Sequence, residues 1–234
     1  MSAKLKTVLT YFTRGEWILL TLSLLTTVVS YCLQSERDPL SLVASLIGVV
    51  ALIFCAKGHP IGQVLIILFS ILYGIISYSF AYYGEMLTYL GMSLPMAILS
   101  LVSWLRNPYE KGKGEVRITR HLTRGELCLM LLLTLLVTAI FYYILKAPAT
   151  SNLLPSTLSV ATSFLAVYLT FRRSPFYALA YAANDIVLIV LWILASLEDI
   201  SYLSVAICFL AFLANDIYGF INWRRMSQKQ AASQ

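Results

Sequence analysis

The chain has few charged residues: only 12% of its 234 positions hold Asp, Glu, Lys or Arg, whereas 59% are hydrophobic. A soluble domain averages about 25% charged residues, so this composition excludes a soluble domain and indicates an integral membrane protein. The formal net charge of +6 would suit a nucleic-acid binder. The basic residues, however, lie in connections between apolar runs and form no continuous face, which is typical of membrane topology and excludes that partner.

The residue patterns that support enzyme chemistry are also missing. No glycine-rich loop could hold a phosphate, and the Gly-x-Gly-Asp pattern of intramembrane aspartyl proteases is absent. His59 and His121 have no partners at metal-ligand spacing. The cysteines lie in or beside apolar runs and also lack such spacing: Cys32, Cys55, Cys128 and Cys208. We therefore predict no catalytic activity, no metal and no cofactor.

Apolar runs that could cross a bilayer occur eight times. A helical span needs about 20 residues, and no run alternates with a period of two, so helix is the only conformation that satisfies the backbone in lipid. The predicted fold is therefore all-α and polytopic. The predicted transmembrane helices cover residues 17–33, 40–56, 61–83, 85–105, 125–145, 155–171, 176–196 and 200–222.

The basic residues also predict how these helices are oriented. If the N-terminus is cytoplasmic, every Lys and Arg except Arg37 and Lys146 falls on the cytoplasmic side. This is the positive-inside pattern, and it places both termini in the cytoplasm. The start of the chain lacks the apolar core and cleavage site of a secretory signal, so we expect it to be retained. The connection 106–124 shows no apolar period, and we interpret it as a solvated linker that fixes the topology.

The two halves of the chain resemble each other. Thr13-Arg14-Gly15-Glu16 precedes the first span and Thr123-Arg124-Gly125-Glu126 precedes the fifth, and both match a helix-capping box. The spans that follow recur in the same order with similar connections. Because each half holds an even number of spans, the repeat is parallel, and a substrate is expected at the midplane between the halves.

The last two spans carry polar residues at membrane depth. The tetrapeptide Ala-Asn-Asp-Ile occurs at 183–186 and again at 214–217, and such groups usually face a bundle interior or a polar cavity. Counting from the helix ends places the two aspartates at different depths. Acid, amide and aromatic groups suit a ligand with a flat ring and hydroxyls. The candidate substrate-binding residues here are Asn184, Asp185, Trp192, Asn215, Asp216, Tyr218 and Asn222.

The first half has no copy of this tetrapeptide, so the predicted site is asymmetric. Gln63, near the cytoplasmic end of the third span, Tyr73 and Tyr89 are the first-half candidates. Pro95 is expected to kink the fourth span. In an alternative interpretation, Asn184 and Asn215 bond to each other or to backbone carbonyls and only hold helices together.

Several motifs resemble those of the PnuC family of bacterial vitamin transporters. They are Tyr73-Gly74, Tyr83-Gly84-Glu85, Leu94-Pro95-Met96 leading to Trp104, and Asn215-Asp216-x-Tyr218-Gly219-Phe220-x-Asn222-Trp223 followed by Arg224-Arg225. The resemblance covers essentially the whole chain and implies a fold similar to SWEET proteins. Its parts would be an N-terminal tail and extra helix (1–39), a three-helix bundle (40–106), a linker and connecting helix (107–146), a second bundle (147–223) and a cytoplasmic tail (224–234).

The resemblance also implies a function. It implies a homotrimer in the bacterial inner membrane that takes up nicotinamide riboside by facilitated diffusion, with a cytoplasmic kinase trapping the substrate by phosphorylation. Ala97 stands where nicotinamide riboside carriers tend to have a glutamine, and Trp192 is the only tryptophan of the seventh span. Thiamine, riboflavin and deoxynucleosides therefore stay as alternative substrates. A non-transporting membrane scaffold or receptor is the alternative from another functional class.

Overall fold

The computed structural model describes residues 11–33, 38–79, 86–110, 114–146, 152–198 and 200–233. In these ranges, eight helical segments are long and apolar enough to span a membrane, which confirms the all-α prediction. They are α2 (Arg14–Leu33), α3 (Pro39–Ala56), α4 (Ile61–Ser79), η1 (Thr88–Ser93) continued by α6 (Leu94–Arg106), α7 (Arg124–Lys146), α8 (Leu153–Phe171), α9 (Phe176–Ser196) and α10 (Leu203–Ala232). A short turn, η2 (Ile200–Tyr202), precedes α10. The Tyr83-Gly84-Glu85 motif and Arg37 lie outside the described residues.

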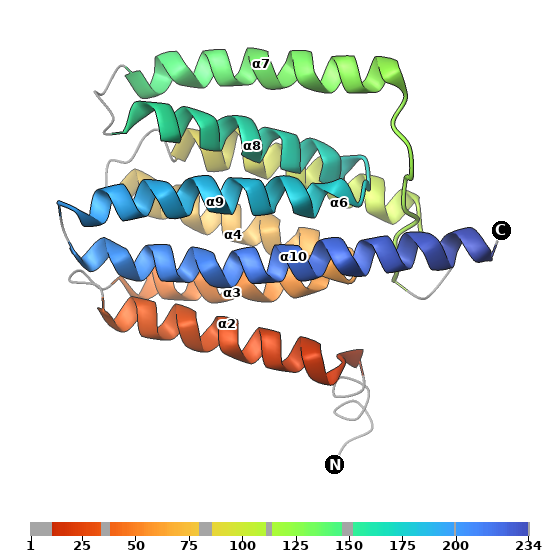
Figure 1. Ribbon diagram of the computed structural model, residues 1–234, viewed down its shortest axis with the longest axis horizontal. Coiled ribbons are helices and arrows are strands. Elements are labelled where there is room, and N and C mark those ends of the chain that lie inside the picture. The colour runs from red at the N-terminus through yellow and green to blue at the C-terminus, as the bar shows by residue number, and fades with distance from the viewer. Residues whose placement is uncertain are drawn as a thin grey trace.

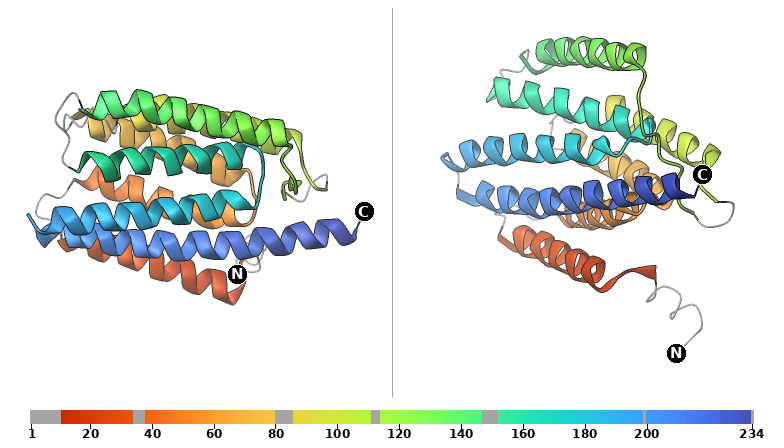
Figure 2. Two further views of the ribbon diagram at one scale, coloured as in Figure 1. Left: turned by 45° about the horizontal axis from the view of Figure 1, so that its top comes forward. Right: turned by 45° about the vertical axis from the view of Figure 1, so that its right-hand side comes forward.

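The helices run side by side, and α2 begins at the same end of the molecule at which α10 ends (Figure 1). We call this the basic end, because α6 ends there at Arg106 and the α8–α9 turn places Arg172 and Arg173 there. Beyond Trp223, α10 continues to Ala232 and extends past the other helices (Figure 2). The segment expected as a tail therefore includes a helical extension of the last span.

The two predicted capping boxes both form. In α2, the Thr13 backbone N–H donates to Glu16 Oε2 at 2.6 Å and the Glu16 N–H donates to Thr13 Oγ1 at 3.3 Å. In α7, Thr123 and Glu126 make the same reciprocal bonds at 2.9 and 3.2 Å. Each box satisfies backbone donors that a helix start leaves unpaired, so the start of each half of the chain is fixed by local sequence.

The fourth span is not a regular α-helix. Its first part, η1, is a π-helix, and α6 begins beside Pro95. Proline has no backbone N–H, so the turn before it loses one helical hydrogen bond and can widen. The irregularity expected at Pro95 therefore takes the form of a π-helical segment on its N-terminal side.

Six helices form a closed ring. Following the contacts around it, α3 packs on α4, α4 on α6, α6 on α8, α8 on α9, α9 on α10, and α10 returns to α3. Helices α8, α9 and α10 form the near side of the ring in Figure 1, with α3, α4 and α6 behind them. Helix α2 packs outside the ring on α3 and α10, and α7 packs outside on α8. The two sets of three helices meet directly at the α3–α10 and α6–α8 contacts.

Reciprocal hydrogen bonds join these two sets at the basic end. Trp104 Nε1 of α6 donates to the carbonyl of Thr170 at the end of α8, at 2.9 Å. Trp223 Nε1 of α10 donates to the carbonyl of Cys55 at the end of α3, also at 2.9 Å. The residue before each tryptophan makes a similar bond to the other set. Ser103 Oγ donates to the carbonyl of Phe171 at 2.9 Å, and Asn222 Nδ2 donates to the carbonyl of Ala56 at 2.8 Å.

The described part of the 106–124 connection is not a solvated linker, and that interpretation was wrong for residues 114–119. The side chains of Val116 and Ile118 are buried. The Ile118 N–H donates to Gln230 Oε1 at 2.9 Å, and the Val116 N–H donates to the carbonyl of Gly58 at 3.1 Å. This strap ties the α10 extension to the α3–α4 turn. Two alternate apolar residues bury one face of an extended segment, a pattern too short to stand out in the sequence.

Candidate functional site

The strongest polar feature inside the ring joins the two tetrapeptide copies. Asp185 of α9 and Asp216 of α10 are 5% and 6% exposed, and their side chains lie next to each other. The expectation that they lie at different depths was wrong. It rested on counting residues from the end of each helix, and such counts give relative depths only if the two helices end at the same level. Helix α10 continues well past the start of α9 at the basic end.

This pair has an unusual charge balance. Neither α9 nor the part of α10 before Trp223 contains Lys or Arg. Asp185 Oδ2 is buried and has no hydrogen-bond partner among the described residues. The pair therefore presents buried carboxyl oxygens, one of them an unused acceptor, and neither α9 nor this part of α10 supplies a cation to neutralise it.

Asn184, beside the pair, is held by α8. Its Oδ1 accepts hydrogen bonds from Thr162 Oγ1 at 2.8 Å and from Ser163 Oγ at 3.1 Å. The carbonyl of the amide is therefore engaged in helix packing, whereas its nitrogen makes no hydrogen bond to a described residue. The two hydroxyls of α8 were not among the predicted residues, and a Thr-Ser pair in an apolar span is the sequence signal that points to them.

The remaining candidates of α10 turn away from the aspartate pair. Asn215 Nδ2 donates to Ser23 Oγ of α2 at 2.7 Å and to the carbonyl of Ala211 at 2.8 Å. Its Oδ1 is buried without a partner in the described chain. Tyr218 donates to Glu16 of α2 at 2.6 Å, and Asn222 bonds to the end of α3. These three candidates thus face α2 and α3, outside the centre of the ring.

Glu16 is the centre of this outer contact, and sequence reasoning treated it only as a capping residue. Its side chain is 2% exposed and accepts two hydrogen bonds from Lys57 Nζ, at 3.0 and 3.1 Å. Lys57 also lies 4.7 Å from the ring centroid of Tyr11. This network attaches the extra helix α2 to both α3 and α10.

An aromatic cluster closes the ring at its basic end. The rings of Trp104 and Trp223 lie 5.4 Å apart, and the ring of Tyr177 lies 4.7 Å from that of Trp223. All three side chains are buried. Trp223 is seven residues after Asp216, which is about 10 Å along a helix. We call these three residues the aromatic plug, and it lies on the basic side of the aspartate pair.

The first-half candidates separate into two places. Gln63 is buried at the basic end, where its Nε2 donates to Cys55 Sγ at 3.4 Å. Tyr73 and Tyr89 lie together, with ring centroids 4.6 Å apart, and both contact Phe69. Their joint position follows from the π-helical η1 turning Tyr89 onto α4. Trp192 is elsewhere, packed at 5.5 Å on Tyr202 toward the opposite end of α9.

Buried hydroxyls of the first half add polarity to the ring. Threonines in the helices of this protein commonly donate to a carbonyl one turn earlier, as Thr134 of α7 does to that of Met130 at 2.7 Å. Ser70 and Ser77 of α4 and Ser100 of α6 are buried but have no hydrogen-bond partner within the described chain. Such groups are costly in a dry interior, so they are suited to face a substrate or water.

Comparison with known proteins gives a consistent result. Residues 38–225 match the family model described as nicotinamide mononucleotide transporter. The chain is 26% identical over 197 residues to the nicotinamide riboside transporter PnuC of Neisseria mucosa, covering 82% of this chain and 74% of that protein. It is 22% identical to the PnuC of Haemophilus influenzae, covering 92% and 91%. A crystal structure of the vitamin B3 transporter PnuC superposes with a TM-score of 0.75, covering 94% of each chain at 22% identity, and shares the fold.

Proposed function

The chain belongs to the nicotinamide mononucleotide transporter family, and on that premise we propose that it takes up nicotinamide riboside or a similar nucleoside or vitamin by facilitated diffusion. It is a multi-pass membrane transporter rather than an enzyme. The proposed pathway runs through the interior of the six-helix ring. The aspartate pair lies beside this pathway and the aromatic plug closes it at the basic end.

The single observation that carries the substrate proposal is the unneutralised Asp185–Asp216 pair. A cationic aromatic ring would gain from the carboxylate and from nearby aromatic faces. Nicotinamide riboside carries a positively charged pyridinium ring and three ribose hydroxyls, so it matches an acid pair flanked by the free amide nitrogen of Asn184. Thiamine is also cationic, whereas riboflavin and deoxynucleosides are neutral. The pair therefore favours the first two ligands over the last two.

The remaining expected site residues keep separate roles in this proposal. Tyr73 and Tyr89 supply aromatic surface from the first half, and Gln63 lies next to the plug, where it would contact a substrate that leaves the site. Asn215, Tyr218 and Asn222 hold α10 against α2 and α3, and so position Asp216 on the opposite side of the helix. Trp192 would meet a substrate that enters from the opposite end.

The membrane arrangement is part of the same proposal. The positive-inside rule assigns the basic end to the cytoplasm of a bacterial cell and places both termini there. We retain the three-helix bundles 40–106 and 147–223, the segments that flank them, and a homotrimer. After entry, a cytoplasmic kinase would phosphorylate the substrate and thereby prevent its return.

Uptake by purified protein tests the proposal. Proteoliposomes with the full chain should accumulate labelled nicotinamide riboside to equilibrium without an ion gradient, and empty liposomes should not. A thermal-shift panel of nicotinamide riboside, thiamine, riboflavin and deoxynucleosides identifies the ligand, because a ligand stabilises the state that binds it. If the protein shows neither uptake nor stabilisation with any of these compounds, the scaffold or receptor alternative is favoured.

A further inference from the structure

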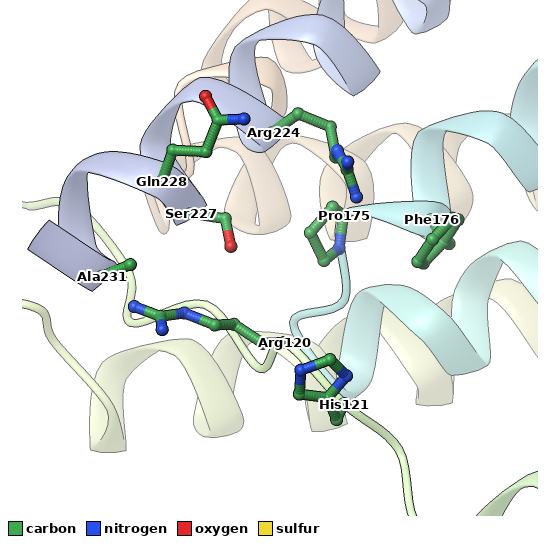
Figure 3. Close-up of a pocket in the computed structure, with 8 residues that line it drawn as sticks. All are labelled: Arg120, His121, Pro175, Phe176, Arg224, Ser227, Gln228 and Ala231. Atoms are coloured by element: carbon green, nitrogen blue, oxygen red, sulfur yellow. The ribbon is translucent and has the colours of Figure 1, made fainter.

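A pocket lined mainly by charged and polar side chains lies outside the ring, on the basic end. It has a volume of about 200 Å³ and is lined by side chains from three separate segments (Figure 3). Arg120 and His121 come from the connection before α7, Phe176 from the first turn of α9, and Arg224, Ser227 and Gln228 from the extension of α10. None of these residues belongs to the proposed transport pathway.

The pocket is positively charged and unneutralised. No acidic side chain lines it, and neither Arg120 nor Arg224 forms a salt bridge or side-chain hydrogen bond to any described residue. The neighbouring acids are engaged elsewhere: Glu115 accepts a hydrogen bond from Gln230, and Glu126 pairs with Arg172. Arg173, by contrast, donates to Ser103, Thr119 and the carbonyl of Arg117. The two pocket arginines are thus available to a ligand, whereas nearby arginines have structural partners.

The other groups around the pocket also favour an anionic ligand. In Figure 3 the hydroxyl of Ser227 points into the space between Arg120 and Pro175, and the guanidinium group of Arg224 lies over the start of α9. A helix start carries a partial positive charge. Guanidinium groups bind phosphate oxygens through paired, charge-assisted hydrogen bonds, and Ser and Gln add neutral donors.

We propose that this pocket binds a phosphate group that is part of a larger molecule. Two sources share this chemistry: a soluble phosphomonoester such as a nucleoside 5′-phosphate, and the phosphate of an anionic lipid headgroup. Because Arg224 directly follows Trp223, a ligand bridging Arg120 and Arg224 ties the 106–124 connection to the helix that carries the plug. The bound phosphate should hold the basic end closed and slow transport. This effect on transport rests on the proposed function, but binding does not.

Ligand binding to the full chain is the direct test. Detergent-purified protein is titrated with adenosine 5′-phosphate, using adenosine as the uncharged control, and nanodiscs of phosphatidylglycerol are compared with nanodiscs of phosphatidylcholine. The test variant is Arg120→Gln with Arg224→Gln. The matched control is Arg124→Gln with Arg225→Gln, which removes the same charge from positions one and four residues away that do not line the pocket. We expect roughly tenfold weaker binding or more in the test variant, since hydrogen bonds to charged groups are lost, and little change in the control.

Each outcome of this binding test either identifies the source of the phosphate or contradicts the site. Stabilisation by adenosine 5′-phosphate that is lost only in the test variant supports a soluble phosphomonoester, and stabilisation only by phosphatidylglycerol with the same variant pattern supports a lipid headgroup. Equal losses in both variants would show general charge attraction and overturn the site, as would a wild-type protein that responds to none of the probes. If binding follows the expected pattern but the protein transports nothing, the proposed function fails and the phosphate site stands.

Discussion

Trp104 and Trp223 lie against each other at the basic end of the ring, with ring centroids 5.4 Å apart, and each indole donates a hydrogen bond to the opposite half of the chain. The acceptors are the carbonyls of Thr170 and Cys55, at the ends of α8 and α3. The two halves therefore close the basic end by the same contact made in both directions. Separating the two halves at this end requires both bonds to break.

Replacing the two indoles should weaken this closure. Trp104→Phe and Trp223→Phe each remove an indole hydrogen bond and part of a buried ring, at a cost of about 2 kcal/mol. The carbonyls of Thr170 and Cys55 keep the backbone N–H groups of Arg173 and Gly58 as donors. Both variants should unfold at lower temperature in detergent, by similar amounts. Trp192→Phe is the control, because its indole makes no hydrogen bond to a described residue. Unfolding temperatures equal to that of the control would contradict a structural role for the two bonds.

The charge of the aspartate pair should decide which substrates are carried. The double variant Asp185→Asn with Asp216→Asn keeps the size of each side chain and removes both carboxyl groups of the pair, so no negative charge remains there. We expect uptake of nicotinamide riboside to fall by roughly tenfold or more, which corresponds to about 1.4 kcal/mol of lost stabilisation. Uptake of the reduced riboside, whose ring is neutral, should change much less.

Asp38→Asn provides the matched control for this double variant, because Asp38 caps α3 at the opposite end of the molecule from the plug. It should leave the ratio of the two uptake rates unchanged. If the double variant reduces uptake of the charged and neutral ribosides equally, the pair has a structural role and does not select for charge.

The attachment of α2 can be tested with two equivalent glutamates. Glu16→Gln leaves Lys57 without its anionic partner at a largely buried site, and losing one member of a buried pair costs about 3 kcal/mol. Glu126→Gln changes the same position of the second capping box, where the glutamate is more exposed. We expect a clear loss of thermal stability for Glu16→Gln and a much smaller one for Glu126→Gln, measured by unfolding in detergent. Equal losses would mean that the capping box, and not the Lys57 pair, provides the stabilisation.

The turn between α3 and α4 should make the protein sensitive to acid. Burial lowers the pKa of the His59 imidazole, and its Nδ1 accepts a hydrogen bond from the Ile61 N–H at 3.2 Å. Since the folded pKa lies below the unfolded value of about 6.5, the unfolded chain binds the proton first. The free energy of unfolding should therefore fall as the pH drops below about 6.5.

Unfolding temperatures between pH 7.5 and 5.5 measure this effect. His59→Gln should reduce the slope of unfolding temperature against pH, whereas His121→Gln, at an exposed position, should leave it as in the wild type. A slope that is unchanged in His59→Gln would rule out His59 as its source.

Much of the fold could be predicted because it depends on local sequence. Eight apolar runs must become helices in lipid, whatever their partners, since no other single segment satisfies its own backbone there. The capping boxes at Thr13 and Thr123 mark helix starts for the same reason, because their bonds connect residues three apart. The charge asymmetry among the connections is likewise a property of the chain and predicts an orientation without any knowledge of packing.

The pairing of side chains between helices could not be predicted in this way. A count along each helix placed Asp185 and Asp216 at different depths, yet the relative shift of α9 and α10 brings their carboxyl groups together. The orientation of α10 about its own axis turns Asn215 and Tyr218 toward α2. Helical period specifies which residues share a face, but not which neighbour that face meets.

The sequence by itself determined the membrane class of this protein, its eight spans and the presence of acids at membrane depth, because composition and local hydrogen bonding are enough for each. Only the tertiary structure decided which acids meet, which tryptophans pack together at the basic end and which residues line one pocket with Arg120 and Arg224. Those contacts join residues as far as 119 positions apart, as with Trp104 and Trp223. They depend on how helices shift and rotate against each other when they pack.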